Sequence, residues 1–384
     1  MRTKPESVLQ GLFRAIAEPG KVSLKQLART FDLKPASLAG KLRPLIKKGL
    51  LAYSEDRGSV GVNPGFGYVL GIDMGGSHLH FALADFCGQI LDDATVKIRP
   101  EDGPRKMIGE MKATARALAK KGARGRLLAI AVGVPSSVAE EGVVAFANNL
   151  PGWTDIRLAP ELERQFRVPV YVENDCNMAA IGEHWLGVAR GVRNFVFIGL
   201  GTGIGSGVFV DGKLVRGRNG AAGEMFKMNI DWRTWNDDFP DTGQFESFVS
   251  GMGIAAEGHK ALDTSSDAQS AGIAQGRDAY FVFQAFREGN PAARAVLEKI
   301  FTMLGVGMAN MVGILDPDLF VLGGGIAKGA PELMLEIADK VIHRIQPTPP
   351  PIRLSSLDDK AQTYGAICSA LDVAHEAIIR RLRA

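Results

Sequence analysis

The segment Gly199–Gly207 restricts the fold of this chain more than any other, because glycine occupies every second position in it. An apolar run precedes the segment, another follows it, and Asp211-Gly212 then supplies a two-residue hairpin signal. Glycine removes Cβ atoms and admits positive φ, so successive backbone N–H groups can close around an anion. Thr202 and Ser206 add hydroxyl donors. The pattern predicts a strand–loop–strand hairpin that binds phosphate; the alternative is a glycine-rich hairpin that only turns the chain.

Two familiar phosphate-binding patterns are excluded for this segment. No Gly-Lys-Ser/Thr follows the glycines, as a Walker loop requires, and no helical pattern follows directly, as a Rossmann turn requires. The predicted loop therefore joins two strands.

Composition sets the class of protein. With 384 residues, 46% hydrophobic and 23% charged, the chain is long enough for two or three domains of an ordinary globular protein. It has no run of 18 uncharged apolar residues, and its N-terminus lacks the apolar core of a signal peptide. The three cysteines are far apart and form no Cys-x-x-Cys pair, which favours a reducing compartment. We expect a cytoplasmic protein with no membrane partner.

Positive charge is concentrated at the N-terminus. Residues 1–58 hold 12 Lys and Arg against 5 Asp and Glu, a balance of +7, so the remainder of this +3 chain carries −4. Helical patterns over 6–17, from Ser23 and from Pro35, followed by a two-stranded wing, predict a winged helix-turn-helix. The expected DNA contacts are Lys34, Ser37, Lys41 and, on the wing, Arg57. The alternative is a small helical domain with a solvated basic face.

Pro44 lies inside the third predicted helix and removes a backbone donor. Gly40, four residues earlier, has no side chain to crowd the proline ring. We therefore expect the helix to tolerate Pro44 with a kink.

A second phosphate-side element is predicted shortly after this basic segment. The apolar strand 68–73 ends in Asp73 and turns through Gly75, Gly76 and Ser77 into another strand. The carboxylate can hold Mg²⁺ directly or through water, while the glycine amides face phosphate. Such turns are common, and the prediction becomes specific only together with Gly199–Gly207.

Two further strand ends carry candidate site residues. Strand 168–173 ends at Asn174-Asp175, where ligands collect in open α/β sheets, so Asp175 is placed for a general base. Strand 319–322 enters Gly323-Gly324-Gly325, a turn that lets the adenosine of a nucleotide approach the backbone. Helices are predicted over 105–121, 177–185, 246–262, 274–287, 291–315, from about 332, and 359–381.

Taken together, these motifs resemble the ROK family (repressors, open reading frames and sugar kinases) over essentially the whole chain. The matching stretches are Gly71–Gly76, Asn149–Trp153, Glu173–Asp175, Gly201–Gly205, Gly220–Glu224 and Leu322–Gly325. The resemblance implies an α/β protein with a winged helix-turn-helix over 1–62 and a two-lobed, actin-like (sugar kinase/Hsp70/actin) ATPase body over 66–382. The small lobe would comprise about 66–175 plus the C-terminal helix, and the large lobe about 176–365.

The resemblance also implies roles for individual residues. Asp175 would be the base for the sugar hydroxyl, and the sugar would be held by Asn149, Asn174, Asp175, Glu224, Lys227 and Glu246. Nucleotide phosphates and their Mg²⁺ would be held by Asp73, Gly75, Gly76, Ser77, Gly201, Thr202, Gly203, Gly205, Gly324 and Gly325. Mg-ATP is therefore a candidate cofactor.

The chain departs from the family at its zinc site. Lys227 stands where the family has a zinc-binding His that also lines the sugar site, and Asp237, Phe239 and Gln244 stand at the three Cys positions. Without a thiolate or imidazole, a zinc site of the S/N type cannot form, so we expect no zinc. This segment also carries several carboxylates, which could attract a hard cation or could simply form a solvated acidic loop. They are Asp231, Asp237, Asp238 and Asp241. Ser136, where the family commonly has Gly, is a smaller departure.

The expected function is that of a sugar-responsive transcriptional regulator, a repressor, that binds operator DNA as a homodimer or a dimer of dimers. An ATP-dependent kinase for a hexose or N-acetylhexosamine is the alternative, because the phosphate-loop and base residues are present. A sugar sensor without phosphoryl transfer is a third reading. The sequence leaves the sugar's identity open.

Overall fold

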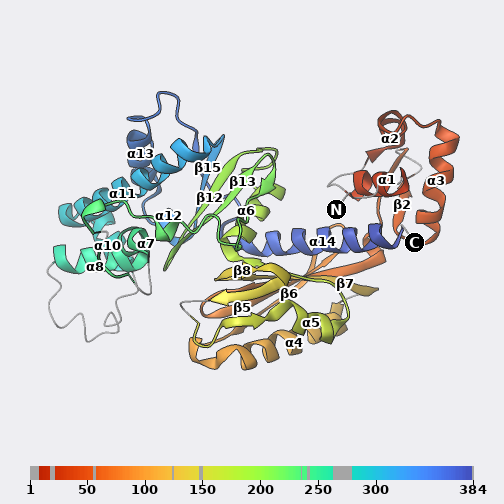
Figure 1. The fold of residues 1–384 in the computed structure, drawn as a ribbon, viewed down its shortest axis with the longest axis horizontal. Helices are drawn as coiled ribbons and strands as arrows, with labels where there is room; N and C mark the ends of the chain where they lie inside the picture. Colours follow the sequence, from red (N-terminus) through yellow and green to blue (C-terminus); the bar gives the residue numbers. More distant parts are fainter. Residues whose placement is uncertain are drawn as a thin grey trace. The chain divides into compact units, whose positions relative to one another are not determined.

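The structure is a computed structural model that describes residues 8–17, 22–54, 58–122, 125–146, 150–234, 236–239, 243–262 and 279–382 (Figure 1). Arg57 and Asn149 lie outside these ranges. The chain divides into two compact units. The first comprises Met1–Pro135, Glu141–Glu173 and Ala366–Ala384, and the second comprises Ser136–Glu140 and Asn174–Gly365.

Three helices and three short strands form the start of the first unit. The helices are α1 (Val8–Ala17), α2 (Leu24–Thr30) and α3 (Pro35–Lys47), and the strands are β1 (Val22–Ser23), β2 (Leu51–Ser54) and β3 (Ser59–Val62). The strand order is β1-β3-β2, so the expected two-stranded wing is part of a three-stranded sheet. Apolar helix faces form the core here, at Leu12, Phe13, Ile16, Leu27, Leu38, Leu42 and Leu45.

The helix α3 runs on through Pro44, as expected from the absence of a side chain at Gly40. Pro35 lies in the first turn of α3, where its missing N–H is no loss. The helix therefore begins at Pro35, as predicted, and continues past Pro44 to Lys47.

The helix α1 packs on the C-terminal helix α14 (Ala361–Arg381), on the part from Ala366 onwards that belongs to the first unit. Gln10 donates through Nε2 to the backbone oxygen of Ile379 at 3.0 Å, in a buried hydrogen bond. Arg14 pairs with Glu376 at the surface, and the ring of Phe13 meets His375 edge-on with centroids 5.9 Å apart. Burial lowers the pKa of His375 to about 4, so its imidazole is neutral at physiological pH.

A five-stranded sheet in the order β11-β7-β4-β5-β6 forms the rest of the first unit. Its strands are β4 (Gly67–Met74), β5 (His78–Asp85), β6 (Ile90–Lys97), β7 (Arg126–Val134) and β11 (Val170–Asn174). The helices α4 (Gly103–Gly122) and α5 (Leu158–Phe166) lie along one face of it (Figure 1). The strands β9 (Val143–Phe146) and β10 (Thr154–Arg157) of this unit pair antiparallel, whereas β8 (Ser137–Ala139) belongs to the second unit.

The second unit repeats this strand arrangement, in the order β14-β13-β12-β15-β16. In both sheets an antiparallel hairpin is followed by a parallel strand, which supports the duplication that two strand–turn–strand patterns suggest. The strands are β12 (Phe195–Leu200), β13 (Ile204–Val210), β14 (Lys213–Leu214), β15 (Leu319–Gly323) and β16 (Ile352–Leu354). Both Asp211 and Gly212 have positive φ, as the predicted two-residue turn between β13 and β14 requires.

Helices cover both faces of this second sheet. Val196, Ile198 and Leu200 pack with the helices on one face, while Phe195 and Phe197 pack with α6 (Asp175–Trp185) on the other. The helices of the first face are α7 (Gln244–Val249), α8 (Gly251–Ala261), α10 (Tyr280–Arg287), α11 (Pro291–Leu315), α12 (Gly325–Gly329) and α13 (Pro331–Ile342). By length and composition α11 could span a membrane, yet most of its apolar stretch is buried among these elements.

Several helix boundaries differ from the predicted ones. The single helix expected over 246–262 is two, α7 and α8, because the chain breaks at Ser250, whose hydroxyl accepts from the Gly253 N–H at 3.4 Å and caps α8. The helix α6 begins at Asp175 rather than at 177, and a short helix, α12, precedes the one expected from about 332. Residues 274–278 of the helix expected over 274–287 lie outside the described ranges.

Candidate functional site

The predicted phosphate loop is the tip of the β12–β13 hairpin in the second unit. Leu200 pairs with Ile204, which leaves Gly201, Thr202 and Gly203 as the tip. The Gly201 N–H donates to the Gly203 oxygen at 2.9 Å, and Thr202 is exposed at the centre of the tip. The hairpin is thus confirmed, with a short and closed tip.

The alternate glycines serve close packing rather than unusual backbone angles. None of the glycines in Gly199–Gly207, all of them described, has positive φ, so that part of our expectation was wrong. Residues two apart on a strand share a face, and here that face is covered by α6. A Cβ at Gly205 would lie 2.6 Å from the Cys176 Sγ, and one at Gly207 would lie 2.6 Å from the Ala180 Cβ. The glycines therefore allow the first turn of α6 to rest on the hairpin.

Ser206 does not offer its hydroxyl to a ligand as we expected. It is buried, and its Oγ donates to the Gly223 oxygen at 2.6 Å. The hydroxyl instead ties the hairpin to the segment that carries Glu224.

The helix α6 places Asp175 beside the hairpin. Asn174 caps the helix, since its Oδ1 accepts from the Asn177 N–H at 3.1 Å, and its Nδ2 donates to the Ser136 oxygen at 3.3 Å. Asp175 Oδ1 accepts from the Cys176 N–H at 2.8 Å. The candidate base is thus the first residue of a helix whose cap is already formed by the neighbouring candidate sugar ligand.

Of three candidate site carboxylates, Glu224 interacts electrostatically with both Asp175 and Glu246. Burial raises the pKa of Asp175 to about 6, against hydrogen bonds from Cys176 that lower it. Burial also raises the pKa of Glu224, with Asp175 and Glu246 adding to the rise and Lys227 opposing it. Burial likewise raises the pKa of Glu246. At neutral pH Asp175 is ionised yet basic enough to accept a proton, which suits a general base.

Glu246 contacts the hairpin tip itself. Its Oε2 accepts from the Ile204 N–H at 2.8 Å, and a Cβ at Gly203 would overlap the same carboxylate. Glu246, which we expect to bind the sugar, therefore also holds the tip of the hairpin in place.

Two other elements meet the tip at the ends of β12 and β15. The Gly251 N–H, at the start of α8, donates to the Gly201 oxygen at 2.9 Å. Gly324 has φ 93°, and a Cβ there would overlap the Leu200 oxygen. The structure thus brings Gly201, Thr202 and Gly203 together with Gly324. The exposed Thr202 and the small residues around it fit a phosphate of ATP, although the Gly201 amide already has a partner.

Gly325, the first residue of α12, also lies in the second unit. The other predicted phosphate residues lie in the first unit, at the end of β4 and in the turn between β4 and β5. The Gly75 N–H donates to the His78 oxygen at 2.9 Å, and Ser77 Oγ lies 2.7 Å from His78 Nδ1. The Gly75 amide and the Ser77 hydroxyl therefore have partners within the turn, while Gly76 has open space around its Cα. Asp73, near the end of β4, is the residue that would hold Mg²⁺.

The expected DNA contacts lie on α3. Lys34 is its N-cap residue, Lys34 and Ser37 are exposed, and Lys41 is half-buried. In the sugar-side segment Lys227 is exposed, with its Nζ 5.1 Å from the centre of the Phe226 ring.

Sequence reasoning missed two residues of this site. Cys176 lies between Asp175 and the hairpin, and burial followed by the charge of Asp175 raises the pKa of its thiol. Its position directly after Asp175, opposite a glycine-only strand face, could have indicated this contact. Gln244 was considered only as a lost zinc ligand, whereas it is 4% exposed and fully hydrogen-bonded. The described residues contain no group of three or more His, Cys, Asp or Glu that could hold a metal ion.

The ROK family model matches residues 69–373 of the chain. The chain belongs to the ROK family. The expected fold is also confirmed by solved ROK proteins: a ROK family transcriptional regulator described as a homologue of the E. coli MLC protein superposes with a TM-score of 0.81 at 21% identity, covering 97% of both chains.

Curated relatives of this ROK protein include both regulators and kinases. A putative xylose repressor from Caldicellulosiruptor sp. (strain Rt8B.4) is 26% identical over 94% of each chain. A glucokinase from Halalkalibacterium halodurans is 31% identical over 70% of this chain and 84% of its own. The structure of a ROK family glucokinase from Streptomyces griseus in complex with glucose and AMPPNP superposes with a TM-score of 0.66 at 25% identity, covering 80% of this chain and 100% of the glucokinase.

Proposed function

We propose that this ROK protein is a sugar-responsive transcriptional repressor that binds operator DNA through residues 1–62 and a sugar through the site around Asp175. The proposal is supported mainly by how much of this chain each relative matches. Similarity to the putative xylose repressor extends over 94% of the chain, whereas the complete S. griseus glucokinase accounts for only 80% of it. The family match begins at residue 69, so the basic N-terminal segment is additional to it.

The N-terminal segment has the properties of a DNA-binding domain. Its +7 balance favours a polyanion, and the exposed residues of α3 are those that a recognition helix places in the major groove. Lys34 and Ser37 are exposed on or next to this helix, and Lys41 follows one turn later. A homodimer would present two such helices to a two-fold operator, with Arg57 of each wing as a further phosphate or minor-groove contact.

The site around Asp175 has the properties of a sugar site. Asn174, Asp175, Glu224 and Glu246 lie in one unit and supply the paired donors and acceptors that several hydroxyls require. Lys227 adds a positive charge next to Glu224, and Asn149 would complete the set. Sugar binding would change the spacing or orientation of the two DNA-binding heads and so release the operator.

A sugar kinase activity is the second candidate, supported by the hairpin tip and by the raised pKa of Asp175. When bound, Mg-ATP supplies the phosphoryl group that is transferred. In this chain Asp73 would hold the Mg²⁺, and the backbone of Gly201, Thr202 and Gly203 would face the phosphates. Asp175 would orient the sugar hydroxyl and accept its proton late, as the new bond to phosphorus makes the hydroxyl acidic.

One experiment separates the candidates. Operator fragments are first selected from genomic DNA by the purified protein, and their retention is measured with D-xylose, D-glucose or N-acetyl-D-glucosamine, each with and without Mg-ATP. We expect one sugar to release the DNA, and retention to fall steeply as salt rises, since each neutralised phosphate releases counterions. Protein lacking residues 1–62 should retain no fragment; if it retains them equally, the assignment of the DNA-binding segment is wrong. ATP consumption with a sugar that leaves DNA bound would favour the kinase.

A further inference from the structure

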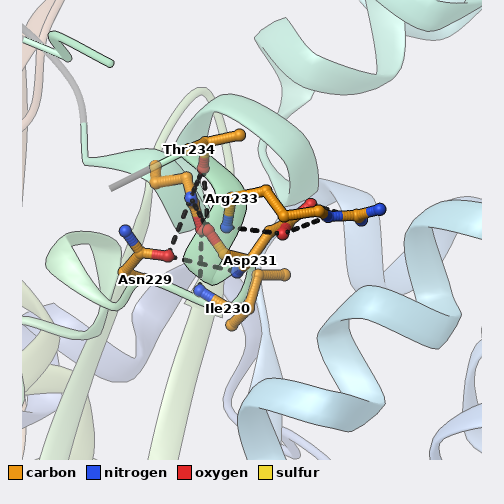
Figure 2. A network of polar contacts seen from close by, with 6 residues as sticks. Asn229, Ile230, Asp231, Arg233 and Thr234 are labelled. Atoms are coloured by element: carbon orange, nitrogen blue, oxygen red, sulfur yellow. Dashed lines mark hydrogen bonds and ion pairs between the residues drawn. The ribbon is translucent and has the colours of Figure 1, made fainter. Parts of the chain in front are cut away.

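Gln244 is a buried glutamine whose amide is fully used. It is the first residue of α7, and its Oε1 accepts from the backbone N–H of Ile230 at 2.7 Å and of Asp231 at 3.3 Å. Its Nε2 donates to Asn229 Oδ1 at 2.9 Å, to the Asp231 oxygen at 3.2 Å and to Thr234 Oγ1. Figure 2 shows these partners converging on one point of the loop.

The loop residues around Gln244 also bond to one another. Asp231 accepts two side-chain hydrogen bonds from Arg233, at 2.8 and 2.7 Å, which hold the pKa of that carboxyl below its usual value (Figure 2). Thr234 Oγ1 donates to the Asp231 oxygen at 2.9 Å. Asp231 is therefore paired within its own loop, and the hard-cation alternative for this carboxylate loses its support.

Gln244 lies where the two ends of this loop meet. The Phe245 N–H donates to the Met228 oxygen at 3.2 Å, and a Cβ at Gly243 would overlap the Phe226 oxygen. The segment before the loop carries Glu224 and Lys227, and α7 after the loop carries Glu246. The amide of Gln244 therefore joins the two segments that supply the site.

A zinc ion does not fit this set of residues. The family's ligand positions hold Lys227, Asp237, Phe239 and Gln244. A lysine ammonium has no lone pair for a metal, a phenyl ring cannot ligate zinc, and the Gln244 amide already has its partners.

We propose that Gln244 is a positioning residue whose hydrogen bonds do here what a bound metal would do, holding the loop ends so that Glu246 stays on the Ile204 N–H and faces the sugar. The chain of contacts runs from the loop, through the Gln244 amide, to α7 and the hairpin tip. The effect of Gln244 on sugar binding rests on the proposed function, whereas its effect on the β12–β13 hairpin tip does not.

Amide hydrogen exchange of the full chain tests the structural part. In Gln244→Met, which keeps the length of the side chain, exchange of the Ile230 and Asp231 amides should accelerate about tenfold, the effect of one lost hydrogen bond. Exchange of the Ile204 amide should accelerate with them, because its acceptor on Glu246 is no longer held. The control is Gln284→Met, a glutamine of the same unit with an exposed bond to Glu288, which should change none of the three.

The outcome at Ile204 decides the proposal. If only the Ile230 and Asp231 amides accelerate, Gln244 merely secures its own loop and the proposal fails. Stoichiometric zinc in protein purified without chelator would also overturn it, because a metal would then hold the loop.

Calorimetry with the sugar identified on the wild type tests the functional part. Gln244→Met should weaken sugar binding by roughly tenfold. Gln244→Glu keeps an oxygen that can accept from the Ile230 and Asp231 N–H groups, but an ionised carboxylate cannot donate. Its affinity for the sugar, relative to that of the wild type, should therefore be higher at pH 5 than at neutral pH, because a protonated carboxyl can donate again. Equal binding by wild type and Gln244→Met would sink the proposal alone, whereas a wild type that binds no sugar would sink the proposed function and leave the exchange result standing.

Discussion

The pKa of Asp175 results from two opposing influences at one residue. Burial disfavours its charged form, and the N–H of Cys176 at the start of α6 favours it. The outcome, a pKa of about 6, places the change of charge just below neutral pH. At neutral pH the Asp175 carboxylate can accept a proton, and its buried charge lowers the free energy of unfolding.

Asp175→Asn should separate these two properties. If this protein phosphorylates a sugar, the rate should fall by roughly 10²–10⁴-fold while sugar binding weakens modestly, because the shape and one acceptor remain. In the wild type the rate should decline below about pH 6, as the carboxylate takes up a proton. An Asp175→Asn enzyme as fast as wild type would refute the assignment.

The stability effect of the same substitution has a defined sign. The folded protein binds the Asp175 proton more tightly than the unfolded chain, so ionisation between pH 3.8 and about 6 lowers the free energy of unfolding of the wild type as pH rises. Asp175→Asn should therefore be as stable as wild type near pH 4 and more stable above pH 6. The limit is about 3 kcal/mol, and the measured gain should be smaller because Asp175 is partly solvated. Chemical denaturation at both pH values measures it.

At the scale of elements, the contact between α6 and the β12–β13 hairpin determines where Asp175 stands. Helix and hairpin approach closely because the facing strand positions are glycines. An alanine at one of these positions must push the helix away or distort the strand.

Gly205→Ala should therefore lower the thermal midpoint, at a cost of about 1–3 kcal/mol for overpacking, because the new Cβ would lie 2.6 Å from the Cys176 Sγ. Gly313→Ala is the matched control: it lies in α11 of the same unit with nothing within 4 Å of its added Cβ, and it should be neutral or stabilising by up to about 1 kcal/mol. The thermal midpoints of the two variants provide the test. Equal shifts in both would mean that the helix–hairpin contact is loose.

The sequence predicts these elements well where periodicity or turn chemistry is local. The hairpin at Asp211-Gly212 and the start of α3 at Pro35 follow from backbone preferences of a few residues. The break at Ser250 was missed because the flanking residues are apolar at helical spacing on both sides, and only the packing of α8 against Gly201 requires a new helix there.

For the candidate site, the sequence proposes residues but does not give the hydrogen bonds between them. Motifs singled out Asp175, Glu224 and Glu246. The bond from Ile204 to Glu246 and the five hydrogen bonds of Gln244 depend on segments that meet only in the folded chain. Glycine at alternate positions indicated a special strand face, but sequence cannot distinguish positive φ from close approach. The presence of α6 on that face decides the matter.

At the scale of the whole molecule, α14 is one continuous helix that passes from the second unit to the first between Gly365 and Ala366. Within the second unit its Gly365 packs against the backbone of Met178 in α6, and within the first unit its later turns hold α1. A helix transmits displacement along its length, so under the proposed function α14 is the route by which a change around Asp175 would reach residues 1–62.

Two substitutions test the α1–α14 contact. Gln10→Met removes the buried side-chain hydrogen bond to the Ile379 oxygen, which keeps its bond from the Leu382 N–H, so it should cost about 1 kcal/mol and weaken DNA retention. Glu376→Gln removes only the surface pair with Arg14, whose side chains are 42% and 48% exposed, and it should change stability by less than about 1 kcal/mol. Thermal unfolding and gel retention measure both. A larger loss of DNA binding in Glu376→Gln than in Gln10→Met would contradict this ranking.

The pairing of α1 with α14 also has a consequence for biosynthesis. The Gln10–Ile379 hydrogen bond joins residues 369 positions apart, and a ribosome that adds about 5–20 residues per second needs roughly 20–70 s to cover that distance. During this time α1 has no permanent partner for the surface that later meets His375 and Ile379. The helix α1 can therefore complete its packing only after α14 has been synthesised, so an unfinished chain that lacks α14 has an incompletely packed N-terminal segment.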